Sequence, residues 1–230
     1  MKRLFILISI LMLFALSLSA QDIDRDREFR MLTQDSTTKA PPKKFKPIGM
    51  LGVKYGVSIS DIKFGQTINK KSVIMPINIS LLYTYYNDLW DMLPNFGLQA
   101  ELRYAREGFN CEYPLIGNER FELIDLSILS QFRINIDRFR ILVNIGPYAG
   151  YRLSVEGREW NSYDNRFDYG LIGGAGCGVT FGKMELHLEG NYKFALSSIY
   201  HMNKTSEEYW NPAYPRNIII SLALFYHLFD

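Results

Sequence analysis

The amino-acid sequence predicts an all-β protein: an eight-stranded antiparallel transmembrane β-barrel of the outer-membrane type. Three observations predict it: a leader typical of exported chains, an apolar periodicity of two in eight segments, and connections that alternate between short turns and long loops. The chain has 230 residues, 47% of them hydrophobic and 14% aromatic, which excludes a disordered chain and a small disulfide-stapled domain. This length suits one sizeable domain.

The first twenty residues have the pattern of a secretory signal peptide. Lys2 and Arg3 give a positive start, residues 4–16 form an apolar run, and residues 17–20 place small side chains before a cleavage site. A retained membrane helix is the alternative. A polar segment follows at once, however, and no later apolar run approaches the ~20 residues that a spanning helix needs. We therefore divide the chain into a signal peptide (1–20), a flexible periplasmic tail (21–47) and a barrel domain (48–230).

The predicted tail differs in composition from the rest of the chain. It alternates charges, carries a polar stretch and ends in a stiff basic segment that contains Pro41 and Pro42. Such a segment buries too little apolar area to offset the entropy of ordering it. We expect a tether, with a docking peptide for a partner as the alternative.

The net charge excludes one class of partner. The formal charge of +2 comes from 26 basic and 24 acidic residues, and removal of the leader with its two basic residues leaves 24 of each. A neutral mature chain lacks the excess of basic residues that would neutralise phosphates along a nucleic acid. We expect no nucleic-acid partner.

Eight segments show the period of two that is typical of strands. In the first, the apolar residues Leu51, Val53 and Tyr55 alternate with small or polar ones. The eight predicted strands lie within residues 51–60, 73–84, 96–104, 124–133, 140–153, 169–181, 184–196 and 217–228. None of the segments between them has the period of a long helix.

The connections between these strands are sorted by length. Residues 87–94, 135–138 and 182–183 are short, whereas longer polar loops lie between the other strands, at 61–72, 107–120, 156–168 and 197–216. An even number of strands with short turns at one end and long loops at the other is typical of outer-membrane barrels. We call these the turn end, expected in the periplasm, and the loop end, expected outside.

The alternate faces of the strands differ in charge. A basic residue that faces hydrocarbon costs about 2–4 kcal/mol at the midplane, so the charged positions are expected to face the lumen. An interior of eight strands is filled by side chains, so mixed signs favour a paired network over an open pore, with a small channel as a remote alternative. The predicted network comprises Lys54, Glu101, Arg103, Asp125, Arg133, Arg140, Arg152, Glu185, Glu189 and Lys193.

A soluble β-sandwich would show the same periodicity with its faces inverted, and the aromatic residues favour the barrel. Rings that gather near strand ends form the two girdles expected at membrane interfaces. Near the turn end they are Tyr83, Tyr85, Phe96, Phe132, Phe139, Phe181 and Tyr226. Near the loop end they are Tyr104, Phe121, Tyr151, Tyr169, Tyr192 and Phe194.

Several stretches together resemble the PorT-like outer-membrane β-barrel proteins of Bacteroidota. They are residues 52–60, 96–108, 145–154, 167–176, 184–194 and 221–228, so that the resemblance covers nearly the whole chain from Gly49. The resemblance implies an eight-stranded outer-membrane barrel and little about activity. One member of that family is tied to protein secretion, a role that we do not carry over. The chain departs from a common barrel ending, because Asp230 follows Phe229.

Signs of catalysis, metal binding or disulfide formation are weak. Glu185, His187 and Glu189 alternate on one strand, but that spacing spreads them over ~13 Å, too far to share one ion. Ser197, Ser198 and His201 could form a nucleophile at the rim, yet no carboxylate stands beside them in the sequence, so a rim-located lipid hydrolase is a remote alternative. Cys111 in a loop and Cys177 within a strand are expected to lie too far apart for a disulfide. We predict no enzyme, no catalytic residue, no metal and no cofactor.

The loops are the remaining candidate surface, because exposed aromatics among polar residues are common in recognition surfaces. The alternative is that these residues cap the mouth or extend the girdle. The candidates are Trp160, Tyr163, Tyr200, Tyr209, Trp210 and Tyr214.

The sequence thus predicts a non-enzymatic outer-membrane protein with a structural or recognition role through its extracellular loops. The alternative is an accessory component of a secretion or transport machinery that contacts partners through the periplasmic tail. The expected partners are outer-membrane lipid, the barrel-insertion machinery during assembly, and a possible protein or envelope component.

Overall fold

The computed structural model describes residues 47–65, 70–89, 93–111, 118–201 and 212–229. The predicted signal peptide and nearly all of the predicted tail lie outside these residues. Within them, no helix is long and apolar enough to cross a membrane.

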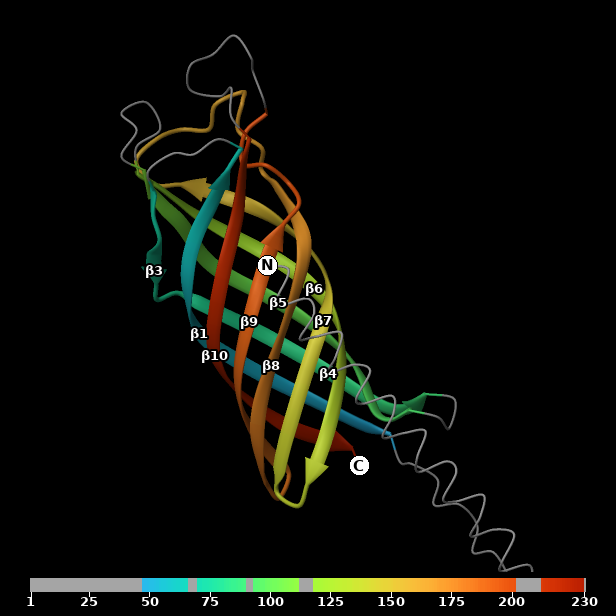
Figure 1. Ribbon diagram of the computed structural model, residues 1–230. Coiled ribbons are helices and arrows are strands. Elements are labelled where there is room, and N and C mark those ends of the chain that lie inside the picture. The colour runs from blue at the N-terminus through green and yellow to red at the C-terminus, as the bar shows by residue number, and fades with distance from the viewer. Residues whose placement is uncertain (1–46, 66–69, 90–92, 112–117, 202–211, 230) are drawn as a thin grey trace, which may run out of the picture. The chain divides into compact units, whose positions relative to one another are not determined.

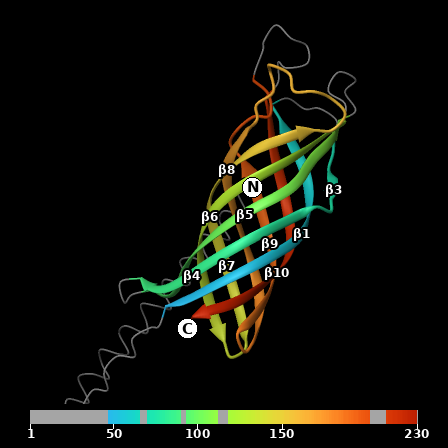
Figure 2. The same cartoon turned by 180° about the vertical axis from the view of Figure 1, so that it is seen from behind.

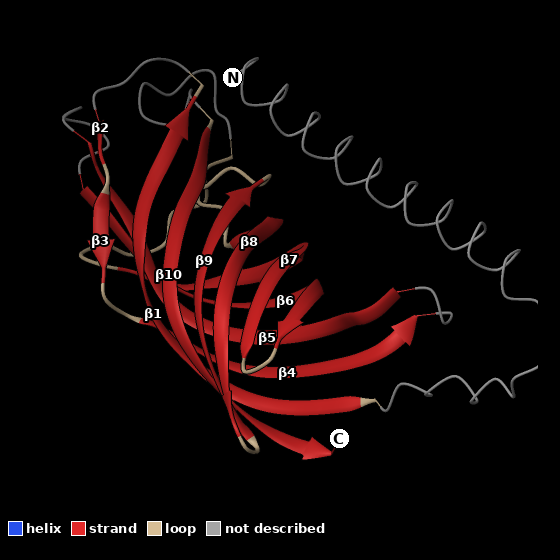
Figure 3. Cartoon of the chain, turned by 60° about the horizontal axis from the view of Figure 1, so that its bottom comes forward, coloured by secondary structure: helices blue, strands red, loops and turns tan. Residues whose placement is uncertain are grey.

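Eight long strands form a closed antiparallel ring (Figures 1 and 3). In the order β1, β4, β5, β6, β7, β8, β9 and β10, each long strand pairs with the next. The ring closes because β10 also pairs with β1 over most of its length, with Gly52 opposite Phe225. The prediction of an eight-stranded antiparallel barrel is therefore confirmed. The strands are β1 (Ile48–Phe64), β4 (Asn78–Leu89), β5 (Leu93–Cys111), β6 (Asn118–Ile136), β7 (Phe139–Val155), β8 (Phe167–Phe181), β9 (Met184–Ala195) and β10 (Ala213–Phe229).

Two short strands precede β4: β2 (Lys70–Lys71) lies in the predicted loop 61–72, whereas β3 (Val73–Met75) is the start of the predicted strand 73–84, which the structure divides into β3 and β4. β3 pairs with β1, and β2 pairs with β5. Pro76 follows β3 and has no backbone N–H to donate, so the ladder is interrupted before β4 begins. Figure 1 shows β3 beside β1 at the edge of the view.

Several strands continue further toward the loop end than the sequence predicts. β1 reaches Phe64, β5 reaches Cys111 and β10 begins at Ala213, so these strands are longer than the 9–11 residues needed to cross a membrane. The reason is that the alternation of apolar and polar residues continues, but with the apolar residues now facing inward. Beyond Ser60 the inward residues of β1 are the apolar Ile62 and Phe64. Figure 2 shows the long β5 and β6 side by side on the other side of the ring.

The outer wall of the ring is apolar. The interior combines polar residues with apolar clusters at both ends and a third apolar cluster of Leu129, Tyr148, Ile172 and Ile219. Leu222 and Val53 are about half exposed on the wall, at 49% and 56%, as expected for side chains that face lipid. One prediction about the girdles is wrong: Phe121 is buried in the interior, because it continues the inward face of β6. Apolar clusters close both ends of the lumen: Ile62, Phe64, Phe109, Cys111, Phe121, Val155, Ile199, Tyr200 and Ala213 at the loop end, and Met50, Leu82, Tyr86, Ala223 and Phe225 at the turn end.

Candidate functional site: the filled lumen and the loop end

The ten charged residues predicted to face the lumen all lie inside the barrel. Nine are at most 4% exposed, and Arg140, near the turn end, is 15% exposed. Three further interior carboxylates, Glu107, Glu119 and Asp168, were not predicted because their positions were assigned to loops. The sequence did contain a signal for Glu107, because it lies an even number of residues after Glu101 on the same strand and so points to the same face.

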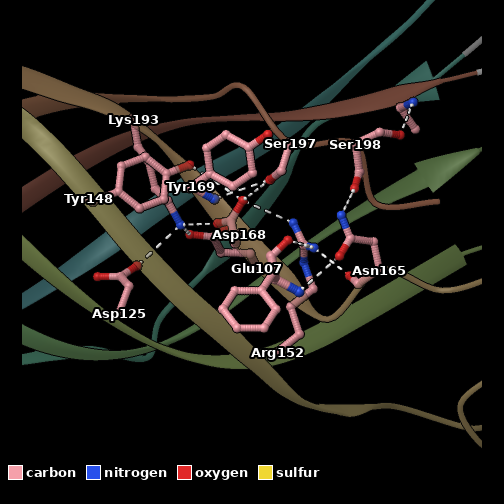
Figure 4. A network of polar contacts seen from close by, with 12 residues as sticks. Glu107, Asp125, Tyr148, Arg152, Asn165, Asp168, Tyr169, Lys193, Ser197 and Ser198 are labelled. Atoms are coloured by element: carbon pink, nitrogen blue, oxygen red, sulfur yellow. Dashed lines mark hydrogen bonds and ion pairs between the residues drawn. The ribbon is translucent and has the colours of Figure 1, made fainter. Parts of the chain in front are cut away.

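Lys193 on β9 is the centre of the largest group of ion pairs (Figure 4). Its Nζ atom lies 2.8 Å from Asp168 Oδ2, 2.9 Å from Glu107 Oε1 and 3.2 Å from Asp125 Oδ2. The ammonium also lies 4.4 Å from the centroid of the Tyr148 ring. One ammonium therefore joins strands β5, β6 and β8 to β9 across the lumen.

Two arginines neutralise the remaining charge of these carboxylates. Arg103 donates from Nε to both oxygens of Asp125 at 3.0 and 3.1 Å. Arg152 donates from Nη2 to Asp168 Oδ1 at 3.0 Å and from Nη1 to the carbonyl of Asn165 at 2.7 Å. We call Arg103, Arg152, Lys193, Glu107, Asp125 and Asp168 the loop-side ion cluster. With three cations and three carboxylates it is neutral, as buried charges require.

A second group lies on β1, β4, β5 and β9. Lys54 Nζ is 2.7 Å from Glu101 Oε2 and 3.4 Å from Glu189 Oε2. Ser80 donates its hydroxyl to Glu101 Oε1 at 2.6 Å. Inside the lumen, these four residues link β1 to β5, which lies beyond β4 on one side, and to β9, which lies beyond β10 on the other.

A third group surrounds Glu185. Its carboxylate lies 2.9 Å from His187 Nε2 and 3.0 Å from His227 Nε2, and it is 3.6 and 3.8 Å from Arg133 and Arg140. His187 thus contacts a carboxylate partner. Among the described residues, no three His, Cys, Asp or Glu side chains are grouped to hold a metal ion.

The segment 196–201 crosses the mouth at the loop end, and we call it the strap. Ile199 and Tyr200 belong to the apolar cluster there, and Tyr200 donates its hydroxyl to Glu119 Oε2 at 2.8 Å. Burial and the nearby charge of Glu119 raise the pKa of Tyr200. Beneath Ile199 lies a cavity of about 10 Å³, room for about one water molecule.

The loop between β7 and β8 is braced against the strap. Arg158 Nη2 lies 2.8 Å from Glu119 Oε1 and 3.0 Å from Asp164 Oδ1. The backbone N–H of Asn165 donates to the carbonyl of Ile199 at 2.7 Å. This described part of the loop end is therefore tied to the barrel by both side-chain and backbone contacts.

The two serines of the predicted hydrolase alternative lie in the strap, and their hydroxyl groups have structural partners. Ser197 donates its hydroxyl to Asp168 Oδ1 at 3.0 Å, and Ser198 Oγ accepts from the backbone N–H of Ala213 at 3.0 Å. His201 is exposed. Both hydroxyls thus hold the strap in place.

The two cysteines occupy different environments. Cys111, expected in a loop, ends β5 and is buried in the apolar cluster at the loop end. Cys177 is exposed on β8, a strand that does not pair with β5.

The residues of the predicted aromatic loop surface differ in exposure. Tyr163 is 38% exposed, and Trp160 is half-buried against the apolar cluster with the Arg166 guanidinium 4.8 Å from its ring centroid. The assignment of Tyr200 to an exposed surface is wrong, because its ring is 4% exposed and closes the mouth.

The other three aromatics of that surface lie in or near the last long connection. Tyr214 lies on β10 and is half-buried. Tyr209 and Trp210 lie outside the described residues.

Comparison with known proteins identifies the family. The family model described as outer membrane protein beta-barrel domain matches residues 43–201. No curated protein matches the chain. Among solved structures, the chain is similar to Ail, the attachment invasion locus protein of Yersinia pestis, in complex with the heparin analogue sucrose octasulfate, with 15% identity over 77% of this chain and 99% of Ail and a TM-score of 0.42.

Two further structures show comparable similarity. The outer membrane protein OprG from Pseudomonas aeruginosa is 10% identical over 81% of this chain and 99% of OprG, with a TM-score of 0.47. The outer membrane protein AlkL is 10% identical over 85% of this chain and 97% of AlkL, with a TM-score of 0.48. Because the family model covers more than half of the chain, this protein belongs to the outer-membrane β-barrel domain family and resides in the outer membrane.

Proposed function

We propose that this protein is a non-enzymatic outer-membrane protein that recognises a macromolecule or an envelope component through the surface at its loop end. The observation that carries the proposal is the filled lumen. The neutral loop-side ion cluster lies beneath an apolar cluster and the strap, and the cavity between them has room for about one water molecule. An interior packed in this way leaves the outer surface as the part that can meet a partner.

The bracing of the loop between β7 and β8 supports the same proposal. Arg158 ties this loop to Glu119, and the backbone of Asn165 ties it to the strap. A surface that is ordered before binding loses less conformational entropy when a partner binds. Tyr163 and the half-buried Trp160 are presented on this braced loop.

Site-specific photo-crosslinking in intact cells tests the proposal. A photo-reactive amino acid replaces Tyr163 in the β7–β8 loop or, as a control, Lys183 in the exposed turn between β8 and β9. We expect one adduct of defined mass from position 163 and none from position 183, and we expect the captured molecule, once purified, to bind the wild-type barrel in lipid nanodiscs. An adduct from position 183 alone would contradict recognition at the loop end.

The same experiment addresses the alternative of a secretion or transport accessory. We infer that the chain falls in the PorT-like group of Bacteroidota, an inference supported by the stretches at 52–60, 96–108 and 145–154. A secretion accessory would meet its machinery on the periplasmic side through residues 21–47. An adduct from position 183 alone, at the turn end, would favour that function.

A further inference from the structure

The lipid-facing wall changes from apolar to charged near the loop end of β5, β6 and β7. On β5 the outward residue Tyr104 is followed by Arg106, and on β6 Ile124 is preceded by Glu122. On β7 a register shift opposite Glu122 and Leu123 turns Ser154 outward. These changes mark the level at which hydrocarbon gives way to headgroups.

A recess of about 160 Å³ lies at this level, and we call it the wall recess; its lining residues are Arg106, Arg120, Phe121, Glu122, Ser154 and Glu156. Arg106 donates to Glu122 Oε1 from Nε at 2.9 Å and from Nη2 at 2.6 Å. Ser154 donates its hydroxyl to Glu122 Oε2 at 3.0 Å. Glu122 is therefore fixed by two donors, while Arg106 stays 46% exposed.

Arg120 is held differently, by neutral acceptors only. Its Nη1 atom donates to the carbonyls of Phe109 at 2.8 Å and Glu119 at 2.9 Å, and its Nη2 atom donates to Asn110 Oδ1 at 2.6 Å. Among the described residues, no carboxylate oxygen lies within ion-pair distance of this guanidinium. Arg120 is thus an oriented cation whose charge is not neutralised by any carboxylate of the described residues.

The geometry points to a binding site in the wall recess for one phosphorylated glycolipid of the membrane. The phosphate would lie against Arg120 and Arg106, since guanidinium groups match phosphate oxygens. Glu156 would accept hydrogen bonds from a sugar hydroxyl or amine. The acyl chains would run along the apolar wall below, where Ile124 and Tyr151 are each 38% exposed.

The apolar wall beneath the charges distinguishes a lipid from a soluble phosphorylated sugar. A soluble sugar phosphate would meet the same polar groups but would bury no acyl chain, whereas a lipid gains affinity from each methylene that it buries. Barrels of this family place their long loops outside, so the recess faces the outer leaflet. This inference does not depend on the partner proposed for the loops.

Native mass spectrometry of the full chain in dodecyl maltoside tests the inference. The probes are diphosphorylated lipid A, lipid A without its phosphates, and soluble glucosamine 6-phosphate. We expect saturable 1:1 binding of the first, binding at least about tenfold weaker for the second, since charge-assisted hydrogen bonds are lost, and no detectable binding of the third. Equal binding of lipid A with and without phosphates would overturn the site, and so would binding of glucosamine 6-phosphate as tight as that of lipid A.

Three variants locate the site. Arg106→Gln and Arg120→Gln should each weaken binding of diphosphorylated lipid A by about tenfold. Arg216→Gln is the matched control, because Arg216 lies toward the loop end of β10, on a strand that pairs with neither β5, β6 nor β7, with its guanidinium 5.0 Å from the Phe194 ring centroid. It should change binding less than twofold. Equal losses in all three variants, or no loss in Arg106→Gln, whose side chain is 46% exposed, would contradict the proposal.

Discussion

The ammonium of Lys193 lies 2.8 Å from Asp168 Oδ2, and both side chains are at most 1% exposed. The pair joins neighbouring strands β8 and β9, and contacts of the same ammonium with Glu107 and Asp125 extend it across the lumen. A buried ion pair of this kind is strongly coupled, because removal of one partner leaves an uncompensated charge in a region shielded from water.

Lys193→Met should therefore destabilise the barrel. The variant leaves Arg103 and Arg152 to balance three carboxylates, and we expect the free energy of unfolding to fall by about 3–5 kcal/mol. Urea unfolding in lipid vesicles, followed by tryptophan fluorescence, measures this. Lys63→Met, at an exposed position of β1, is the control and should change the free energy by less than about 0.5 kcal/mol. Equal effects of both substitutions would contradict the role of the cluster.

Arg158→Gln should loosen the β7–β8 loop without disturbing the ring. The variant removes the charged contacts to Glu119 and Asp164, so local opening should become about tenfold more frequent. Hydrogen exchange of the amides at 158–166 reports this opening, and the amides of β6 should be unchanged. Glu159→Gln, on the exposed neighbour, should leave exchange as in the wild type. A uniform increase across all strands would argue against a local brace.

Tyr200→Phe should reveal a dependence on alkaline pH. The variant loses the hydrogen bond to Glu119, a charged acceptor, and the free energy of unfolding should fall by about 1.5–3 kcal/mol at pH 8. The folded pKa of Tyr200 is raised by burial and by Glu119, so the stability it contributes is fully present below the ordinary tyrosine pKa of about 10. Above that pH, the wild-type advantage should shrink by about 1.4 kcal/mol per pH unit. An advantage that stays constant to pH 11 would contradict the buried phenol.

Gly174→Ala should destabilise the wall between β8 and β9. A Cβ atom at this position would lie 2.2 Å from the backbone oxygen of Gly190, so the backbone would have to shift to remove the clash. We expect a loss of about 1–3 kcal/mol in the urea experiment, as for other overpacked sites. Gly190→Ala is the control on the opposite strand, since its Cβ would lie 3.9 Å from the nearest atom, Ala175 O. A larger loss for Gly190→Ala would show that close approach is not the cause.

The period of two is enough to predict most of the barrel and its interior charges. The parity that places Glu101 and Arg103 inside follows from geometry along one strand. The partners do not follow from it. Lys193 contacts Glu107 and Asp125 because of the register and tilt of strands that are far apart in the sequence.

The ends of the strands were the weakest part of the prediction, for a physical reason. Near the loop end the strands continue, but apolar residues replace the charged ones on the inward face, as Ile62 and Phe64 do on β1. A rule that ends a strand where its lipid-facing side becomes polar therefore ends it too early. The same change of the inward face placed Phe121 on the wrong surface. Tyr200 was misplaced for another reason: it lies beyond the end of β9, where no strand periodicity indicates that its side chain packs into the apolar cluster.

The central claim is that charge pairs and the strap fill the lumen. Single-channel recording in planar bilayers at neutral pH tests it most directly, with insertion verified by heat-modifiable migration of the same sample on gels. The wild-type barrel should show no stable unitary conductance, because among the described residues the loop-side ion cluster and the apolar cluster above it are buried across the lumen. A reproducible open level with a linear current–voltage relation would contradict a filled lumen.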